Sequence, residues 1–76
     1  MAEKWENDLA DVILILTSDD TSPDGWVRVE QVGPEMTKRG YTLSKDELTD
    51  AMGIVAASNN WQIEVVDGTG IRVRPY

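Results

Sequence analysis

Residues 61–76, Trp-Gln-Ile-Glu-Val-Val-Asp-Gly-Thr-Gly-Ile-Arg-Val-Arg-Pro-Tyr, decide the fold of this chain. Four apolar residues alternate there with polar ones on either side of a glycine-rich stretch, residues 67–70: Ile63, Val65, Ile71 and Val73. Period-two apolar runs that flank such a stretch are typical of a β-hairpin. The pattern therefore predicts two antiparallel strands joined by a turn at residues 67–70.

Three stretches before the hairpin have helical spacing. In the first, apolar residues recur three and four positions apart and form one stripe of an amphipathic helix: Trp5, Leu9, Val12, Ile13 and Leu16. A loop-like stretch, residues 17–25, and a short β-type segment, residues 26–29, come next. The second helix then extends to about Arg39. We expect Pro34 in its first turn, where the missing N–H costs little, and Gly40 at its end.

The third helix has a clear start at a capping box. The residues Ser44-Lys45-Asp46-Glu47 predict that the Ser44 hydroxyl accepts from the Glu47 N–H and that the Glu47 carboxylate reaches back to Ser44. One apolar face follows, made of Leu48, Ala51, Met52 and Val55. Residues 58–60 end this helix before the hairpin. The order helix, strand, helix, helix, strand, strand predicts one α+β domain over residues 1–76, a winged helix with three helices, a short strand and a C-terminal β-hairpin wing.

Composition limits both the core and the chemistry. A chain of 76 residues buries only about 60 % of its unfolded surface, so the core is small. We expect that core to draw on every predicted element: Trp5, Leu9, Val12, Ile13, Leu16, Val27, Val32, Met36, Leu48, Met52, Val55, Ile63 and Val73. The chain has no cysteine and no histidine, which removes disulfides, thiolate zinc sites and the commonest general base. We therefore expect no enzyme activity, no cofactor and no metal.

One acidic stretch partly matches a calcium site. Asp20, Ser22 and Asp24 have the spacing of the first ligands of an EF-hand loop. Downstream the match fails, because Gln31 occupies the position of the bidentate glutamate and a strand is predicted where the second helix belongs. An acidic surface turn is the commoner structure for such a stretch.

Two features of the sequence bear on location. Residues 1–6 lack the basic and apolar regions of a signal peptide. The longest apolar run, residues 12–16, is far shorter than the roughly 20 residues that span a membrane. We therefore expect a cytoplasmic protein that does not enter membranes.

The formal net charge of -7 is unevenly distributed. Residues 1–37 carry nine acidic and two basic residues, whereas residues 38–76 carry five of each. The whole excess of negative charge therefore lies in the first half. An acidic total argues against tight non-specific binding to phosphates, although the neutral second half leaves room for a local basic patch.

Four groups of residues carry a family resemblance. They are Gly25-Trp26-Val27, Val32-Gly33, the pair Leu48 and Met52, and Ile71-Arg72-Val73-Arg74. In spacing, over about residues 9–75, they resemble the LOTUS domain, also called OST-HTH, a winged-helix module. The chain departs from that family before the third helix, where Gly40-Tyr41-Thr42-Leu43 replaces the usual Tyr-Gly pair. The resemblance implies binding of RNA, in some members G-rich RNA, or of a protein partner such as a helicase.

Acidic and apolar surface positions favour a protein partner. The outer face of the third helix carries Asp46 and Asp50 among small residues, which repels phosphates and reaches few base edges. On the first helix, Leu14 lies about 160° from the core stripe, with Asp11 nearby. We expect a loop or the hairpin to cover Leu14; otherwise it anchors a partner or a homodimer. The first hypothesis is thus a module that regulates or docks onto a protein through Asp11, Leu14, Asp46 and Asp50.

The alternative is weak, sequence-tolerant binding of RNA or DNA. Its candidate residues are the cations of the second half: Lys38, Arg39, Lys45, Arg72 and Arg74. If these lie near one edge, they follow a phosphate backbone, with Trp61 or Tyr41 as a stacking surface. Pairing with nearby acids such as Glu64 across the hairpin is the structural alternative.

Overall fold

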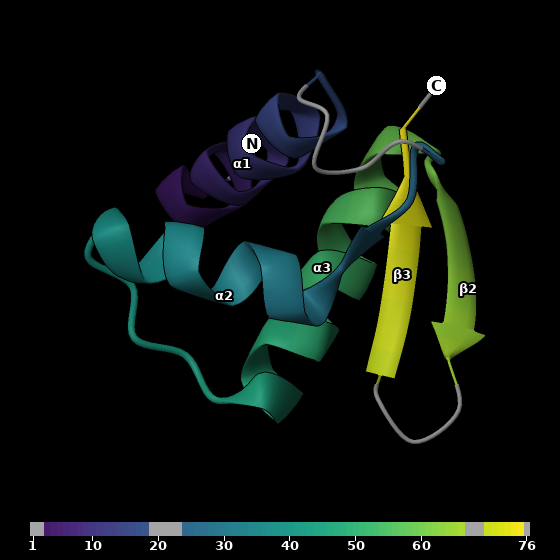
Figure 1. Ribbon diagram of the computed structural model, residues 1–76. Helices are drawn as coiled ribbons and strands as arrows, with labels where there is room; N and C mark the ends of the chain where they lie inside the picture. Colours follow the sequence, from purple (N-terminus) through teal and green to yellow (C-terminus); the bar gives the residue numbers. More distant parts are fainter. Residues whose placement is uncertain (1–2, 19–23, 67–69, 76) are drawn as a thin grey trace.

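Three helices and three strands form the part of the chain that the computed structural model describes, residues 3–18, 24–66 and 70–75 (Figure 1). In chain order they are α1 (Lys4–Ser18), β1 (Val27–Arg28), α2 (Val29–Lys38), α3 (Lys45–Asn59), β2 (Gln62–Val66) and β3 (Gly70–Arg74). The predicted α+β class and the predicted order of elements are confirmed.

The strands form one antiparallel sheet in the order β1-β3-β2. Strand β2 pairs with β3 from Gln62↔Arg74 to Val66↔Gly70, as expected for the hairpin. The turn predicted at residues 67–70 lies, apart from Gly70, outside the described residues. The predicted short strand, β1, joins the other side of β3 through Val27↔Val73 and Arg28↔Arg72, so the hairpin is part of a three-stranded sheet.

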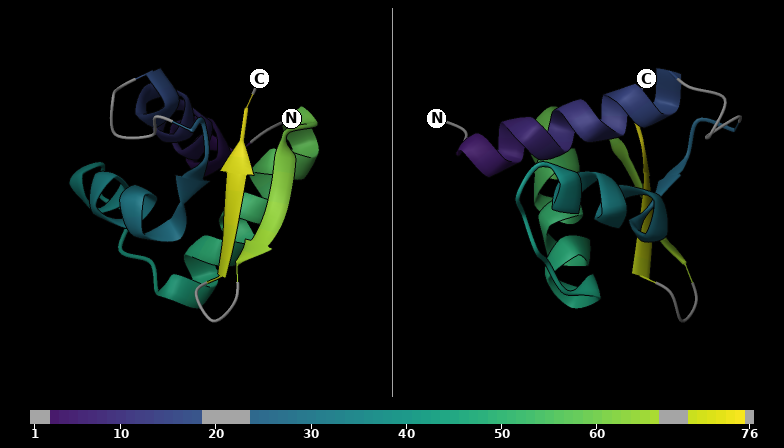
Figure 2. Two further views of the ribbon diagram at one scale, coloured as in Figure 1. Left: turned by 45° about the vertical axis from the view of Figure 1, so that its right-hand side comes forward. Right: turned by 60° about the vertical axis from the view of Figure 1, so that its left-hand side comes forward.

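The helices cover one face of this sheet and enclose the core. Figure 2 shows the sheet almost edge-on in its right-hand view, with α2 and α3 on the same side of it. Helix α3 packs along β3 and β2, and α1 packs on both other helices. The buried apolar residues come from α1, α2, α3, β1 and β3: Leu9, Val12, Ile13, Leu16, Val27, Val29, Val32, Met36, Leu48, Ala51, Met52, Val55, Ala56 and Val73.

Two residues expected in the core lie elsewhere. Ile63 is 45 % exposed, although its pairing partner Val73 is completely buried. The reason is position in the sheet: β3 is central and lies over the helices, whereas β2 is an edge strand. Trp5, in the first turn of α1, is partly buried and packs against the outside of the core.

Helix α2 begins earlier in the chain than expected, which changes the position of Pro34 within it. The backbone N–H of Arg28 donates to Oε1 of Gln31 at 2.9 Å, which fixes the start of the helix at Val29. Pro34 therefore lies in the second turn, not the first, and it has no N–H to donate to the carbonyl of Glu30. The predicted stop is confirmed, because Gly40 has a φ of +94° directly after the C-cap.

Helix α3 has the capping box that the sequence predicts. The Glu47 N–H donates to the Ser44 hydroxyl at 3.2 Å, and the Ser44 N–H donates to Oε1 of Glu47 at 2.9 Å. At the other end, Asn60 adopts a left-handed conformation with a φ of 57° and turns the chain into β2. These two caps set where α3 begins and ends, and its buried apolar residues determine which face points inward.

Candidate functional site

Large apolar side chains remain at the surface of the described residues. They are Leu14 (44 % exposed), Ile15 (52 %), Ile54 (49 %), Ile63 (45 %) and Val65 (78 %). Single exposed apolar residues are normal, but a group of neighbours indicates an interaction site. Three of the five, Ile54, Ile63 and Val65, come from α3 and β2, which pack against each other.

A groove runs between α3 and the hairpin. Its lining is mainly apolar or small: Thr49, Asp50, Gly53, Ile54, Ala57, Ile63 and Ile71. The pairing of Ile63 with Val73 and of Val65 with Ile71 puts all four on one face of the sheet, and Val73 is buried against the helices. We call Asp50, Ile54, Ile63, Val65 and Ile71 the α3–β2 face.

A second hollow continues this surface around α3. It is lined by Trp5, Tyr41, Leu43, Glu47, Asp50, Ala51 and Ile54. Because Asp50 and Ile54 line both hollows, the apolar surface is continuous from the start of α1 to the edge of the hairpin. The tyrosine in this hollow is held in place, since the Tyr41 hydroxyl donates to Oδ2 of Asp8 at 2.6 Å. That hydrogen bond is also what raises the pKa of Tyr41 most.

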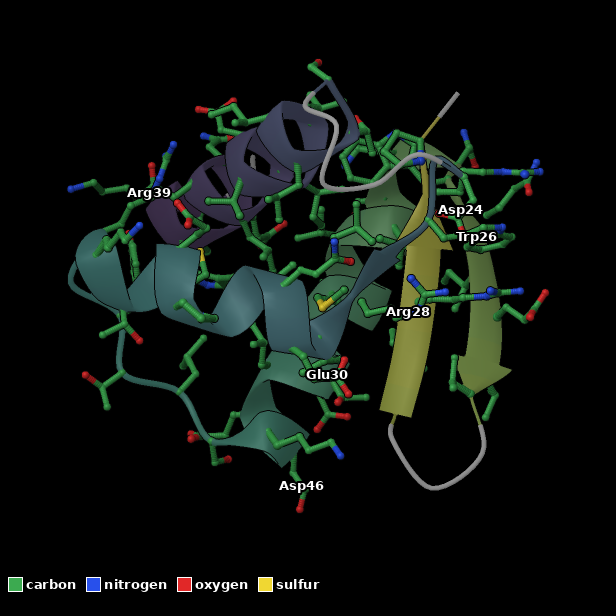
Figure 3. The ribbon with its side chains drawn as sticks, in the orientation of Figure 1. Asp24, Trp26, Arg28, Glu30, Arg39 and Asp46 are labelled. Carbon is green, nitrogen blue, oxygen red and sulfur yellow. The ribbon has the colours of Figure 1, made fainter. Side chains whose placement is uncertain are left out.

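Negative charge borders the apolar surface on α3. Asp46, Glu47 and Asp50 are all exposed, and neither aspartate forms an ion pair with a described residue. The Ser44 backbone N–H, and next its hydroxyl, hold the pKa of Glu47 below its ordinary value, so this carboxylate stays ionised. Figure 3 shows Asp46 at the start of α3, pointing away from the body of the fold.

The four residues expected to bind a protein fall on two separate surfaces. Asp46 and Asp50 lie on α3, and Asp50 lines the groove. Asp11 and Leu14 lie on the exposed side of α1, away from the buried stripe that faces α3. The expected cover over Leu14 is wrong, because no described loop or strand buries this side chain. Only the α3 pair therefore belongs to the surface around the α3–β2 face.

The five cations of the alternative hypothesis do not form one patch. Lys38 pairs with Glu35 at 3.2 Å, and Arg39 pairs with Asp8 at 3.5 Å. Arg72 pairs with Arg28 at the end of β1, directly before α2 begins. Lys38 lies at the other end of this ten-residue helix, which is about 15 Å long. In Figure 3, Arg28 and Arg39 lie on opposite sides of the molecule.

The remaining cation and the expected stacking rings also lie apart from the sheet cations. Lys45 lies at the first position of α3 and lines a third hollow with Glu30. Of the two rings, Tyr41 is bonded to Asp8, and Trp61 packs against the core. The nucleic-acid alternative required the five cations to lie near one edge of the molecule, and they do not.

Arg72 and Arg74 do belong to a smaller cluster on the outer face of the sheet. Their guanidinium carbons lie 4.3 and 4.7 Å from the centre of the Trp26 ring. Arg72 also pairs with Glu64, and Arg74 donates to Oε1 of Gln62 at 2.6 Å. The predicted cross-strand pairing of Glu64 is thus confirmed, and the two arginines are already engaged within the sheet.

Asp24 and Arg28 complete this cluster (Figure 3). The Trp26 N–H donates to Oδ1 of Asp24 at 3.0 Å, which is the main cause of the lowered pKa of Asp24. Arg28 pairs with the same carboxylate at 3.6 Å. Sequence reasoning missed Trp26 and Arg28 because they reach Arg72 and Arg74 only through the pairing of β1 with β3. The signal available was their spacing, which puts both on one face of a strand.

The calcium alternative gains nothing from the structure. Asp20 and Ser22 lie outside the described residues. Asp24 is engaged with Trp26 and Arg28, and the described part of the chain contains no group of three side chains suited to a metal ion. Within the same residues, no helix combines the length and the apolar character needed to cross a membrane.

Comparison with known proteins returns no relative: no family model, no curated protein and no solved structure matches this chain. The winged-helix and LOTUS resemblance therefore stays a prediction. A function has to be inferred from the geometry of the α3–β2 face itself.

Proposed function

We propose that this chain is a non-catalytic winged-helix module that docks onto a protein partner and so regulates or recruits it. The observation that carries the proposal is the α3–β2 face, where exposed Ile54, Ile63 and Val65 lie beside exposed carboxylates on α3. A contiguous apolar surface with a charged rim is the usual composition of a protein interface.

The arrangement of elements supports the winged-helix assignment. A hairpin lies alongside the third of three helices, as the wing does beside the recognition helix in that fold (Figure 1). In that fold, the exposed face of the third helix and the wing are the surfaces offered to a ligand. The resemblance to LOTUS domains, some of which bind a protein partner, points the same way.

Charge favours a protein over a nucleic acid as the ligand. Asp46, Glu47 and Asp50 would repel phosphates from α3, where a nucleic acid would have to bind. The cations that remain are divided between two sides of the fold, and most are already paired. A partner with apolar anchors and neighbouring Lys or Arg residues complements the α3–β2 face instead.

The test is an NMR titration of the ¹⁵N-labelled chain at low salt. Its ligands are short basic peptides with apolar anchors and, in parallel, single-stranded RNA and duplex DNA. We expect the peptides to shift the amide signals of Asp50, Ile54 and Ile63, and charge reversal in Asp46→Lys/Asp50→Lys to remove that response. The matched control is Asp11→Lys, which reverses an exposed acid on α1. RNA or DNA shifts at Trp26, Arg72 and Arg74, without a peptide response, would favour the nucleic-acid alternative.

A further inference from the structure

The sheet has two edges, and they differ in how they are protected. Strand β1, at one edge, is only two residues long and leads directly into α2. Strand β2, at the other edge, has five residues, and no described strand pairs with its outer side (Figure 1). A long edge strand presents a row of backbone donors and acceptors that another strand can use.

Strand β2 lacks most of the devices that usually prevent such pairing. Natural edge strands carry Lys, Pro or a β-bulge, or they are very short. Residues 62–66, Gln-Ile-Glu-Val-Val, contain neither Lys nor Pro, and each residue pairs one-to-one with β3 without a bulge. The one charged residue of this strand, Glu64, pairs with Arg72 of β3, so the β2 edge, unlike the two-residue β1, is available for pairing.

Two apolar side chains at this edge are also left uncovered. Ile63 and Val65 point to the α3 side of the sheet and are 45 % and 78 % exposed. Directly opposed side chains of paired strands lie about 4.5–5.5 Å apart, so a strand added beside β2 would cover both. Its residues on that side would also lie over the groove that Ile54 and Ile63 line.

We propose, on the basis of the docking function above, that the partner binds as an extended segment that adds a fourth strand to the sheet along β2. Its side chains alternate. Apolar residues face the α3 side, next to Ile63 and Val65, and the Lys or Arg residues between them lie on the opposite face of the sheet, beside Glu64. Main-chain hydrogen bonds provide affinity, and the groove provides specificity.

A second copy of this chain fits the edge poorly. Antiparallel pairing of all five residues of two β2 strands would place Glu64 opposite Glu64, and like charges in that position destabilise a sheet. Each copy also carries a net charge of -7. A basic segment of another protein avoids both problems, because it puts no carboxylate opposite Glu64 and its charge is opposite to that of this chain.

The test compares two synthetic peptides of identical composition, Val, Ile and Lys. In one, apolar and basic residues alternate; in the other, they are arranged at helical spacing. We expect the alternating peptide alone to bind, to shift the amide signals of β2 and to slow the hydrogen exchange of β2 amides. The variant Val65→Lys should weaken this binding roughly tenfold, because an edge lysine blocks strand addition. The control Ile15→Lys changes an exposed apolar residue on α1 and should bind normally.

Each contrary result has a separate meaning. Binding of the helical-spacing peptide alone, on α3 and without protection of β2 amides, would overturn strand addition and leave the docking function standing. Failure of both peptides would overturn both proposals. A dimer seen by sedimentation without peptide, and abolished by Val65→Lys, would identify a second copy as the occupant and overturn the basic partner.

Discussion

At the residue scale, Gly70 lies where the sheet and α3 leave no room for a side chain. Its φ is +105°, and a Cβ at this position would lie 2.9 Å from Oγ1 of Thr49. Gly40 has a similar φ of +94°, but a Cβ there would meet no atom within 4 Å. A side chain would therefore cause backbone strain at both glycines, but a steric clash only at Gly70.

We expect Gly70→Ala to destabilise the fold more than Gly40→Ala. The second variant adds only the strain of a left-handed backbone, roughly 1–3 kcal/mol, whereas the first adds the clash with Thr49 as well. Urea unfolding followed by circular dichroism measures both losses. Adding Thr49→Ala to Gly70→Ala should recover part of the difference, and equal losses for the two glycine variants would refute the steric argument.

Ser44 makes a second prediction at this scale. Its hydroxyl accepts the Glu47 N–H at the start of α3, one of the donors that a helix leaves unsatisfied. Removing an N-cap hydroxyl typically costs about 1 kcal/mol of stability, so Ser44→Ala should lower the free energy of unfolding by about that amount. Thr42→Ala, two residues away and also exposed, is the matched control and should leave stability unchanged.

At the element scale, α2 carries a proline that its geometry does not require. Pro34 is exposed in the second turn, and it removes the hydrogen bond that the Glu30 carbonyl would otherwise accept. We expect Pro34→Ala to stabilise the protein by roughly 1–2 kcal/mol, the helical gain reduced by the extra freedom of the unfolded chain. Thermal and urea unfolding measure this gain. A decrease would mean that the ring of Pro34 contributes packing that outweighs the missing bond.

The elements themselves were predictable because their signals are local. The Ser44 cap, the stop at Gly40 and the alternation around residues 67–70 each depend on a few neighbouring residues. The position of Ile63 was not predictable, since alternation marks one face of a strand but does not say whether the strand is central or at an edge. For the same reason, the sequence did not reveal the candidate site. An edge strand beside α3, with its apolar residues uncovered, follows from the order β1-β3-β2, which no local pattern encodes.

At the scale of the whole molecule, acid should weaken the fold. The Trp26 N–H lowers the pKa of Asp24, and the Ser44 N–H lowers the pKa of Glu47. For each carboxyl the folded pKa is below the unfolded one, so its stabilisation is complete above about pH 5 and is lost as the pH falls through the folded value. The urea midpoint should therefore be lower at pH 3 than at pH 7.

A double variant isolates these two groups from the other carboxyls. Asp24→Asn/Glu47→Gln keeps the size of both side chains and removes their titration. The fall in urea midpoint between pH 7 and pH 3 should be smaller in this variant than in the original protein. An identical fall in both proteins would assign the acid sensitivity to other groups.

The central position of β3 also governs when the sheet can form during synthesis. Both β1 and β2 pair only with β3, yet β3 is the last of the three to leave the ribosome. Until residues 70–74 emerge, the sheet cannot form, because Val27 and Ile63 both pair with Val73 of β3. Completion of the fold therefore coincides with release of this segment from the exit tunnel, and a nascent chain stalled before it would remain open to chaperones.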